Sequence, residues 1–265
     1  MLNVVILSSM KRENHNHNPY RELHPYPPFV PPQASRLIVG SFPPIKLTRQ
    51  IVEDGGDCII RTYNNYLKRH SRTGRDVDFY YGSEKNYFWK LFADVHETRL
   101  TDLNSIKRLL TATDTAITDI FEVCIRKLYD KKSKKLILPS QTLSKKNDID
   151  LAVSSGDSSL YPLILRDIPA ILGNNRSIKS LIFTSSFVAR LFRKNFAQPH
   201  YSSQNEDTYI IIDGRKLKIV LVPSPSGAAN VSIGNKFEYK QRRQADKEFN
   251  TYKYRLEIYR KVLIN

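Results

Sequence analysis

Two stretches decide the fold: Arg36-Leu37-Ile38-Val39-Gly40-Ser41-Phe42-Pro43-Pro44 and Leu217-Lys218-Ile219-Val220-Leu221-Val222-Pro223-Ser224-Pro225-Ser226-Gly227. In each stretch a short apolar run, which is typical of a buried strand, leads into a loop of Gly, Pro and Ser residues. Ligands of open α/β sheets bind beyond the carboxyl ends of the strands. We therefore expect the two loops to border one pocket, although roughly 180 residues separate them in the chain.

Further strand and helix patterns alternate between these stretches. Residues 115–121 and 179–184 read as strands, the first ending near Asp119. Apolar residues recur at helical spacing after Asn86, and a serine pair at 185–186 caps a second helical pattern. This alternation predicts a single α/β domain with a mostly parallel sheet.

The end of the chain departs from that alternation. Residues 208–212 and 217–222 flank Asp213-Gly214, a dipeptide favoured in hairpin turns, so we expect two antiparallel strands there. Apolar residues between 249 and 263 then follow at spacings of 3, 4, 3 and 4, which predicts a helix with one apolar and one basic face.

Composition bounds the class of protein. A chain of 265 residues that is 40% hydrophobic can bury the core of one α/β domain. Its 42 Lys and Arg residues exceed its 26 Asp and Glu residues, giving a net charge of +16. Such a charge favours a polyanionic partner, with nucleic acid as the first candidate. The alternative is a solvated basic surface that only aids solubility.

The cysteines and the first residues point to a reducing compartment. Cys58 and Cys124 are the two cysteines, and neither belongs to a CxxC pair, which argues against a zinc site or a disulfide framework. The apolar run of residues 1–7 is too short to cross a bilayer and lacks a leading positive region. We expect a cytoplasmic protein with no membrane partner.

We expect the chain to divide into an N-terminal extension, residues 1–23, and one domain, residues 24–265. His15, His17 and His24 stand among Asn and Pro residues without nearby cysteines or clustered carboxylates, so we interpret them as a solvated tail and expect no metal. The proline-rich residues 24–32 cannot form a helix. The basic residues 68–75 read as a loop, either a phosphate contact or a solvated run of charge.

The first loop suits a flat ligand better than a phosphate. Familiar signatures such as GxGxxG, the Walker loop, HExxH and GxSxG are missing from the sequence. Prolines in the loop remove amides that a phosphate cradle needs, whereas Gly40 permits close backbone approach. The amides of Ser41 and Phe42 can then face the ligand's oxygen atoms, and Phe42 can stack on it. The alternative is a plain turn from strand to loop.

The second loop, residues 223–227, alternates Pro and Ser. This composition makes a stiff loop that exposes hydroxyl groups and a few amides. Such a loop can bind the phosphates of a nucleic-acid backbone at a small ordering cost. A rigid connector is the alternative interpretation.

Four motifs together resemble the uracil-DNA glycosylase superfamily, and most closely its hypoxanthine-DNA (deoxyinosine) and mismatch-specific glycosylase groups. The motifs are Leu37-Ile38-Val39-Gly40-Ser41-Phe42-Pro43, Tyr80-Tyr81-Gly82 with Asn86-Tyr87-Phe88-Trp89, Ala116-Ile117-Thr118-Asp119-Ile120, and Val222-Pro223-Ser224-Pro225-Ser226. The likeness covers roughly residues 24 to 263 in the same order. It implies a three-layer α/β/α sandwich around a short, mostly parallel sheet.

The resemblance also implies roles for particular residues. Asn86 would orient a water molecule or contact a base flipped out of DNA, unless it only caps a helix. Asp119 would line the pocket and polarise water, unless it only begins the following turn. Tyr81 would form a wall on which the base stacks, unless it is a core tyrosine. The expected base pocket comprises Gly40, Ser41, Phe42, Pro43, Tyr81 and Phe88, and Pro223, Ser224, Pro225, Ser226 and Gly227 are the expected DNA contacts.

Two departures from the superfamily shape the functional hypotheses. Phe42 and Val222 stand where the most active uracil enzymes of the superfamily carry an acidic residue and a histidine. The leading hypothesis is a monomeric, monofunctional DNA glycosylase that needs no cofactor and removes hypoxanthine, uracil or a related deaminated base. The alternatives are a catalytically silent DNA-binding protein of the same fold, and an unrelated α/β enzyme acting on a small anionic substrate.

Overall fold

A computed structural model describes residues 21–44, 47–54, 57–62, 76–126, 128–130, 135–137, 151–153, 160–196 and 209–264. His15 and His17 of the expected extension lie outside the described residues, and so do the basic residues 68–75.

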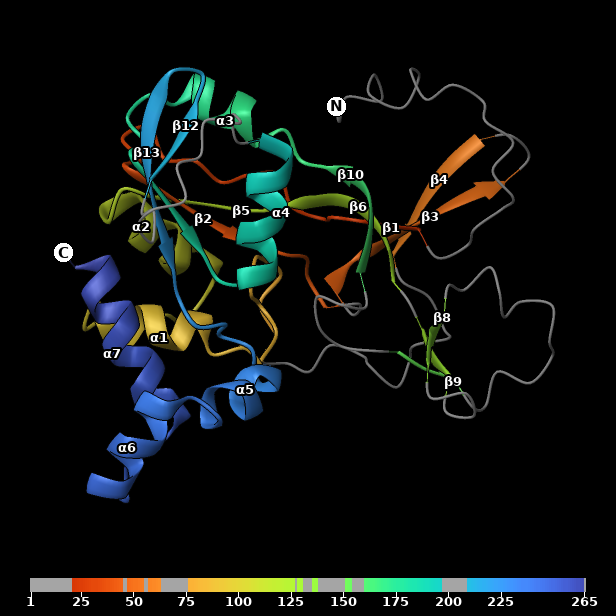
Figure 1. Cartoon of the computed structure of the whole chain (residues 1–265). Coiled ribbons are helices and arrows are strands. Elements are labelled where there is room, and N and C mark those ends of the chain that lie inside the picture. Colours follow the sequence, from red (N-terminus) through yellow and green to blue (C-terminus); the bar gives the residue numbers. More distant parts are fainter. Residues whose placement is uncertain are drawn as a thin grey trace.

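A central five-stranded sheet organises the molecule (Figure 1). Its strands, in spatial order, are β12 (Tyr209–Ile212), β13 (Arg215–Leu221), β11 (Ser180–Phe183), β2 (Arg36–Gly40) and β5 (Thr115–Asp119). Four of them run parallel, and only β12 pairs antiparallel with its neighbour. The predicted α/β class with a mostly parallel sheet is confirmed.

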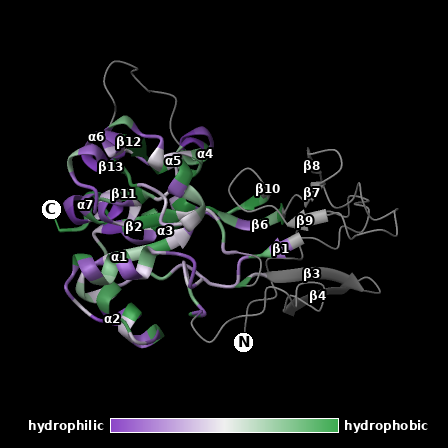
Figure 2. Ribbon diagram, turned by 90° about the horizontal axis from the view of Figure 1, so that it is seen from below, coloured by the Kyte–Doolittle hydropathy of each residue, from purple (hydrophilic) through white to green (hydrophobic). Residues whose placement is uncertain are grey.

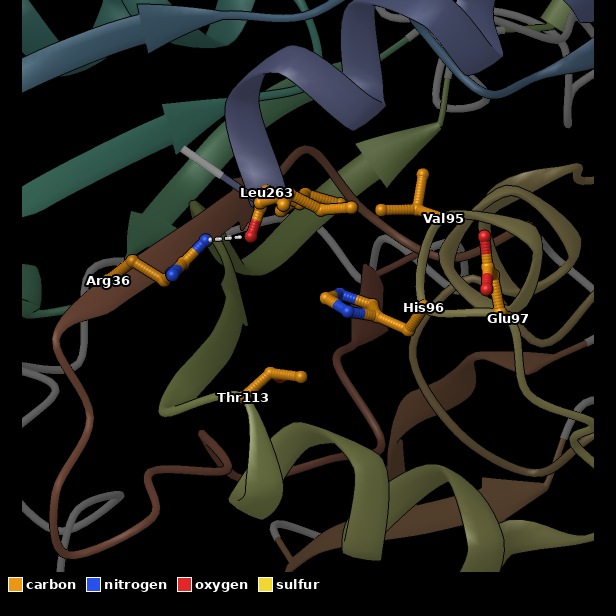
Figure 3. A pocket seen from close by; sticks show the side chains of 7 residues that line it. Arg36, Val95, His96, Glu97, Thr113 and Leu263 are labelled. Carbon is orange, nitrogen blue, oxygen red and sulfur yellow. Dashed lines mark hydrogen bonds between the residues drawn. The ribbon is translucent and has the colours of Figure 1, made fainter.

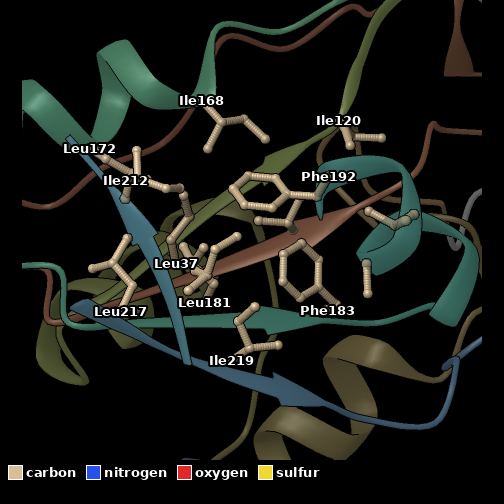
Figure 4. Packing of buried hydrophobic residues seen from close by; sticks show 14 of the residues in the cluster. Leu37, Ile120, Ile168, Leu172, Leu181, Phe183, Phe192, Ile212, Leu217 and Ile219 are labelled. Atoms are coloured by element: carbon tan, nitrogen blue, oxygen red, sulfur yellow. The ribbon is translucent and has the colours of Figure 1, made fainter. Parts of the chain in front are cut away.

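Helices cover both faces of this sheet. The first face carries α3 (Ile168–Asn174) and α4 (Ser186–Phe196), and the second carries α1 (Phe88–Val95), α2 (Leu103–Ala112) and α7 (Thr251–Leu263). Figure 4 shows the packing on the first face, where Phe183 of β11 lies beside Phe192 of α4. The predicted three-layer arrangement is therefore confirmed.

Alternation along strand β2 connects the two cores. Leu37 and Val39 pack into the cluster under α3 and α4, whereas Ile38 packs into the cluster under α1, α2 and α7. All three side chains are at most 1% exposed. A strand buried on both faces is apolar at every position, which is why the sequence shows a continuous run here.

Local signals in the sequence set the boundaries of several elements. Asp213 and Gly214 adopt positive φ angles of 49° and 73°, which is the conformation expected of the hairpin turn between β12 and β13. Asp102 and Ser105 form a capping box at the start of α2. Asn250 caps α7 by accepting bonds from the amides of Tyr252 and Lys253.

A second five-stranded sheet, which the sequence did not predict, extends from the domain (Figure 1). Its order is β10 (Leu160–Leu165), β6 (Phe121–Arg126), β1 (Arg21–Leu23), β3 (Arg49–Asp54) and β4 (Asp57–Thr62), and all neighbours are antiparallel. The chain enters it directly after β5. Strand β1 uses the last three residues of the expected extension, and the domain boundary at residue 24 stays a prediction.

Smaller elements complete the described chain. Three short strands, β7 (Leu128–Asp130), β8 (Lys135–Ile137) and β9 (Leu151–Val153), form a third sheet. After β13 come a 3-10 turn (Gly227–Ala229), α5 (Asn230–Gly234) and α6 (Phe237–Ala245). Figure 2 shows hydrophilic colouring along α6 and α7.

Candidate functional site

The two loops that open the sequence argument lie at the same edge of the central sheet. Strands β2, β5, β11 and β13 are parallel, so the residues that follow them emerge on one side. This edge receives Gly40 at the end of β2 with residues 41–44 after it, Asp119 at the end of β5, Thr184 after β11 and residues 223–227 after β13. The candidate site is built at this edge.

A third segment joins the site through backbone contacts. Asn86 and Ser226 form an antiparallel bridge, and the amide of Tyr87 donates to the carbonyl of Pro225 at 3.0 Å. The segment that precedes α1 is thereby fixed to the 223–227 loop. Two of the motifs picked out from the sequence are in direct contact here.

Gly40 is the point where the side chains of the site converge. The Oδ1 atom of Asp119 and the hydroxyl of Tyr81 both lie so close over its Cα that a β-carbon would collide with each of them. The Tyr81 hydroxyl is also 2.9 Å from the Thr184 hydroxyl at the end of β11. A glycine at position 40 is therefore a steric requirement of this arrangement.

Tyr81 covers Gly40 in an unusual backbone conformation. Its φ angle is 53°, in the left-handed region that bulky residues rarely adopt. Its ring stacks on Phe88, with 4.2 Å between ring centroids and an interplanar angle of 20°. Phe88 is completely buried behind it. Of these two stacked rings, Tyr81 is the one at the surface of the site.

His24 corrects the expectation of a solvated tail. It is 5% exposed, and its Nε2 atom lies 2.9 Å from Oδ2 of Asp119, which is 4% exposed. Its predecessor in the chain is the last residue of β1, whose pairing with β6 directs the imidazole inward. Sequence reasoning missed this pair because the two partners stand 95 positions apart in the chain.

Burial and the neighbouring groups act on the protonation of His24 beside Asp119. Burial lowers the pKa of His24 more strongly than the neighbouring Asp119 raises it, so the neutral imidazole is favoured. Nδ1 of His24 lies 3.1 Å from the amide nitrogen and 2.9 Å from the carbonyl oxygen of Tyr26, while Nε2 faces Oδ2 of Asp119. His24 therefore holds Oδ2 of the carboxylate, while Oδ1 faces Gly40.

Arg166 and Tyr80 enclose the His24 side of the pair. Arg166 is 7% exposed and donates to the Tyr26 carbonyl through both terminal nitrogens and to the Tyr80 hydroxyl at 3.0 Å. Burial raises the pKa of Tyr80, which keeps its hydroxyl protonated and able to donate to the Tyr26 carbonyl at 3.1 Å. The positive charge of Arg166 also lowers the pKa of His24.

Asn86 stands one residue before the N-cap position of α1, which is Tyr87, and its side chain bonds to the first residue of the helix. Its Oδ1 atom accepts a hydrogen bond of 2.9 Å from the amide of Phe88, the first residue of α1. The residue is half-buried beside the 223–227 loop. A role in orienting water or contacting a base stays a prediction, and the two roles are compatible.

The chain at the end of β2 stays hydrogen-bonded to the residues that follow β5. The carbonyls of Gly40 and Ser41 accept bonds from the amides of Ile120 and Phe121, at 2.8 and 3.3 Å. The ring of Phe42 is half-buried and meets His24 edge-on, with 5.6 Å between ring centroids. Pro43 is buried. Phe42 thus packs against the histidine that holds Asp119.

Two side chains of α7 hold the 223–227 loop through hydrogen bonds to its backbone. Arg255 donates to the carbonyls of Ser224 and Ser226 at 2.7 and 3.0 Å, and the hydroxyl of Tyr259 donates to the carbonyl of Pro223 at 3.1 Å. Sequence reasoning did not single out Arg255. The available signal was its place four residues before Tyr259, on the helix face that packs inward.

A cavity of about 500 Å³ lies at the opposite edge of the sheet (Figure 3). It is lined by Arg36, Val95, His96, Glu97, Thr113, Leu263 and Ile264. Arg36 begins β2 and donates to the carbonyl of Leu263 at 2.6 Å. Burial and the neighbouring Arg36 lower the pKa of His96. None of the residues proposed from the sequence belongs to this cavity.

Two further observations concern ligands and membranes. Among the described residues, no three His, Cys, Asp or Glu side chains are grouped so as to hold a metal ion. Within the same ranges, no helix combines the length and the apolar character needed to cross a bilayer.

Comparisons with known proteins find similarity among solved structures. No protein-family profile matches the chain, and no curated protein sequence matches it. Among solved structures, the solution NMR structure of a "putative Uracil DNA glycosylase" from Methanosarcina acetivorans is similar, with a TM-score of 0.40 and 13% sequence identity. The match covers 89% of this chain and 99% of that chain.

Proposed function

We propose that this protein is a monofunctional DNA glycosylase that hydrolyses the N-glycosidic bond of a deaminated base, hypoxanthine or uracil, extruded from the duplex. The observation that carries the proposal is the buried Asp119 carboxylate held over Gly40 at the sheet edge where the two loops emerge. Extrusion is required because the glycosidic carbon is inaccessible inside the duplex.

The chemistry assigns a role to each end of the Asp119 carboxylate. Water forms a bond to C1′ while the bond from C1′ to the base nitrogen breaks, and the base leaves with the bonding electron pair. Positive charge develops on the sugar in the transition state, so a preorganised carboxylate stabilises it. Oδ1 accepts the proton of the attacking water, and His24 fixes Oδ2. The proton is then released to solvent or to the departing base.

The leaving base requires donors and a surface for stacking. Negative charge grows on the base as the bond breaks, and the side-chain amide of Asn86 is the donor that we assign to it. Gly40 allows the base to approach the backbone, and Tyr81 supplies the aromatic face. Because Tyr81 lies over Gly40, its ring must move aside as the base enters.

DNA is the partner that the charge and the second loop support. The chain carries a net charge of +16, and the 223–227 loop presents serine hydroxyls on a stiff backbone. Phosphate contacts of this kind position a protein on DNA without reading its sequence.

A panel of lesions tests the proposal. Labelled duplexes that carry hypoxanthine, uracil or normal bases are incubated with the protein and then treated with alkali, which breaks the strand at an abasic site. We expect breaks at one of the deaminated bases and none in the normal duplex. Asp119→Asn is the matched control, since it keeps the shape and loses the carboxylate. No cleavage of any lesion at high protein concentration removes the glycosylase proposal.

A catalytically silent DNA-binding protein is the second candidate. The position of Tyr81 favours it, because its ring covers Gly40 and its hydroxyl is already bonded to Thr184. DNA binding that weakens with added salt, without strand breaks in the same panel, is the result that selects this candidate.

A further inference from the structure

Arg255 is a buried cation with an unusual set of partners. It lies on α7 and is 0% exposed. Its guanidinium donates to four oxygen atoms: the backbone carbonyls of Ser224, Ser226 and Thr251 and the side-chain oxygen of Asn230. It also lies over the ring of Tyr87, 5.6 Å from the centroid. All of these partners are neutral groups.

Among the residues that the structure describes, dipoles therefore solvate the charge of Arg255 and no carboxylate pairs with it. Burial lowers the pKa of Arg255, and the neighbouring Tyr259 and Tyr87 act in the opposite direction. Taking an ion out of water is costly, and hydrogen bonds to carbonyls offset that cost only in part. An anion bound near the guanidinium would offset the rest of this desolvation cost.

The contacts of Arg255 converge on the 223–227 loop, one of whose two predicted roles is to bind DNA phosphates. Two of its four acceptors belong to the 223–227 loop, and Tyr87 is joined to the same loop through Pro225. The hydroxyl oxygens of Ser224 and Ser226 accept bonds from the amides of Ser226 and Ala228, at 3.3 Å each. A hydroxyl that accepts one bond still carries its own O–H donor.

We propose that Arg255 is a positioning residue for a DNA phosphodiester: it holds the 223–227 loop in the shape that binds the phosphate, and its buried charge attracts that phosphate. This inference rests on the proposed function, because it takes DNA as the ligand. Arg255 itself does not touch the DNA, since its side chain is covered by the loop.

Binding to an undamaged, labelled duplex tests this role, with fluorescence anisotropy measured over a series of potassium chloride concentrations. The variants are Arg255→Gln, which removes the charge, and Arg255→Lys, which keeps it. Arg260→Gln is the matched control, because Arg260 lies on the same helix but is exposed. Thermal unfolding of each variant shows whether it is folded.

The expected results distinguish the effect of the Arg255 charge on DNA binding from the effect of the loop's shape. Arg255→Gln should weaken binding about tenfold or more, and the slope of log K against log salt should become shallower by up to about 0.9, the value for one phosphate. Arg255→Lys should weaken binding by about threefold or more at an unchanged slope, because one ammonium cannot reach all four acceptors. Arg260→Gln should stay within about threefold of the wild type.

Equal affinities and slopes for folded Arg255→Gln and Arg260→Gln would overturn the inference. If Arg255→Gln does not fold, wild-type affinity of Arg255→Lys overturns it. A wild-type protein that does not bind DNA overturns it as well. The glycosylase proposal fails separately, when the wild type binds duplexes but the lesion panel shows no strand breaks.

Discussion

At the scale of single residues, Gly40 constrains the site most tightly. Asp119 and Tyr81 approach its Cα from two different segments of the chain. Gly40→Ala places a methyl group against both oxygens, so one of the two side chains must move. We expect a loss of about 1 to 3 kcal/mol in unfolding free energy and a loss of base excision of at least about tenfold. Urea denaturation and the cleavage assay measure the two effects.

Gly173 supplies the matched control. It lies in α3, where a β-carbon would meet nothing within 4 Å. Gly173→Ala should leave cleavage unchanged and leave stability unchanged or up to about 1 kcal/mol higher, because alanine favours helix. Wild-type stability and activity in Gly40→Ala would show that the space over Gly40 is not used as we propose.

At the scale of elements, the start of α1 combines a structural and a proposed chemical role in Asn86. Its Oδ1 atom caps the helix at Phe88, whereas its amide hydrogens are the donors assigned to the leaving base. Asn86→Ala should lower the unfolding free energy by about 1 kcal/mol through loss of the cap. Asn86→Asp keeps the capping oxygen and should retain that stability. Urea denaturation at neutral pH measures the difference.

Turnover then distinguishes the two roles. We expect both Asn86 variants to cleave at least about tenfold more slowly under single-turnover conditions, with DNA affinity within about threefold for Asn86→Ala. Full turnover by Asn86→Asp would contradict a donor role for the amide and leave only the cap.

The elements also show what can be predicted from sequence and what cannot. The runs at 36–39 and 217–222, the turn at Asp213-Gly214 and the helix after Asn86 carry strong local patterns, and the structure contains each of them. Local patterns say nothing about His24, whose partner Asp119 is distant in sequence, or about the pairing of the three-residue strand β1. The pattern predicted only that the C-terminal helix has a basic face, and charge alone does not reveal that Arg255 is buried.

At the scale of the whole molecule, the His24 network ties the two large sheets together. Asp119 ends a strand of the central sheet, while His24 and Arg166 directly follow strands β1 and β10 of the second sheet. Their hydrogen bonds meet at Tyr26 and Tyr80, and all of these side chains are buried. Protonation of this network therefore changes the free energy of unfolding of the domain.

This coupling predicts how stability depends on pH. The pKa of His24 in the folded protein is lowered from its ordinary value of 6.5, so below that pH the unfolded chain binds a proton that the native state does not. Stability should then fall as the pH is lowered from about 7.5 to about 5.5, by at most about 1.4 kcal/mol per pH unit for this one group. Burial, Asp119, Arg166 and the backbone of Tyr26 act on this pKa, and the ring of Tyr80 faces the imidazole.

His24→Gln removes the titrating group and keeps an N–H donor for Asp119. Urea denaturation across that pH range should show a weaker loss of stability in this variant than in the wild type. His96, whose pKa is also lowered by burial, accounts for a remaining dependence, and His96→Gln should keep the part due to His24. The same pH dependence in His24→Gln as in the wild type would mean that the imidazole is not held neutral.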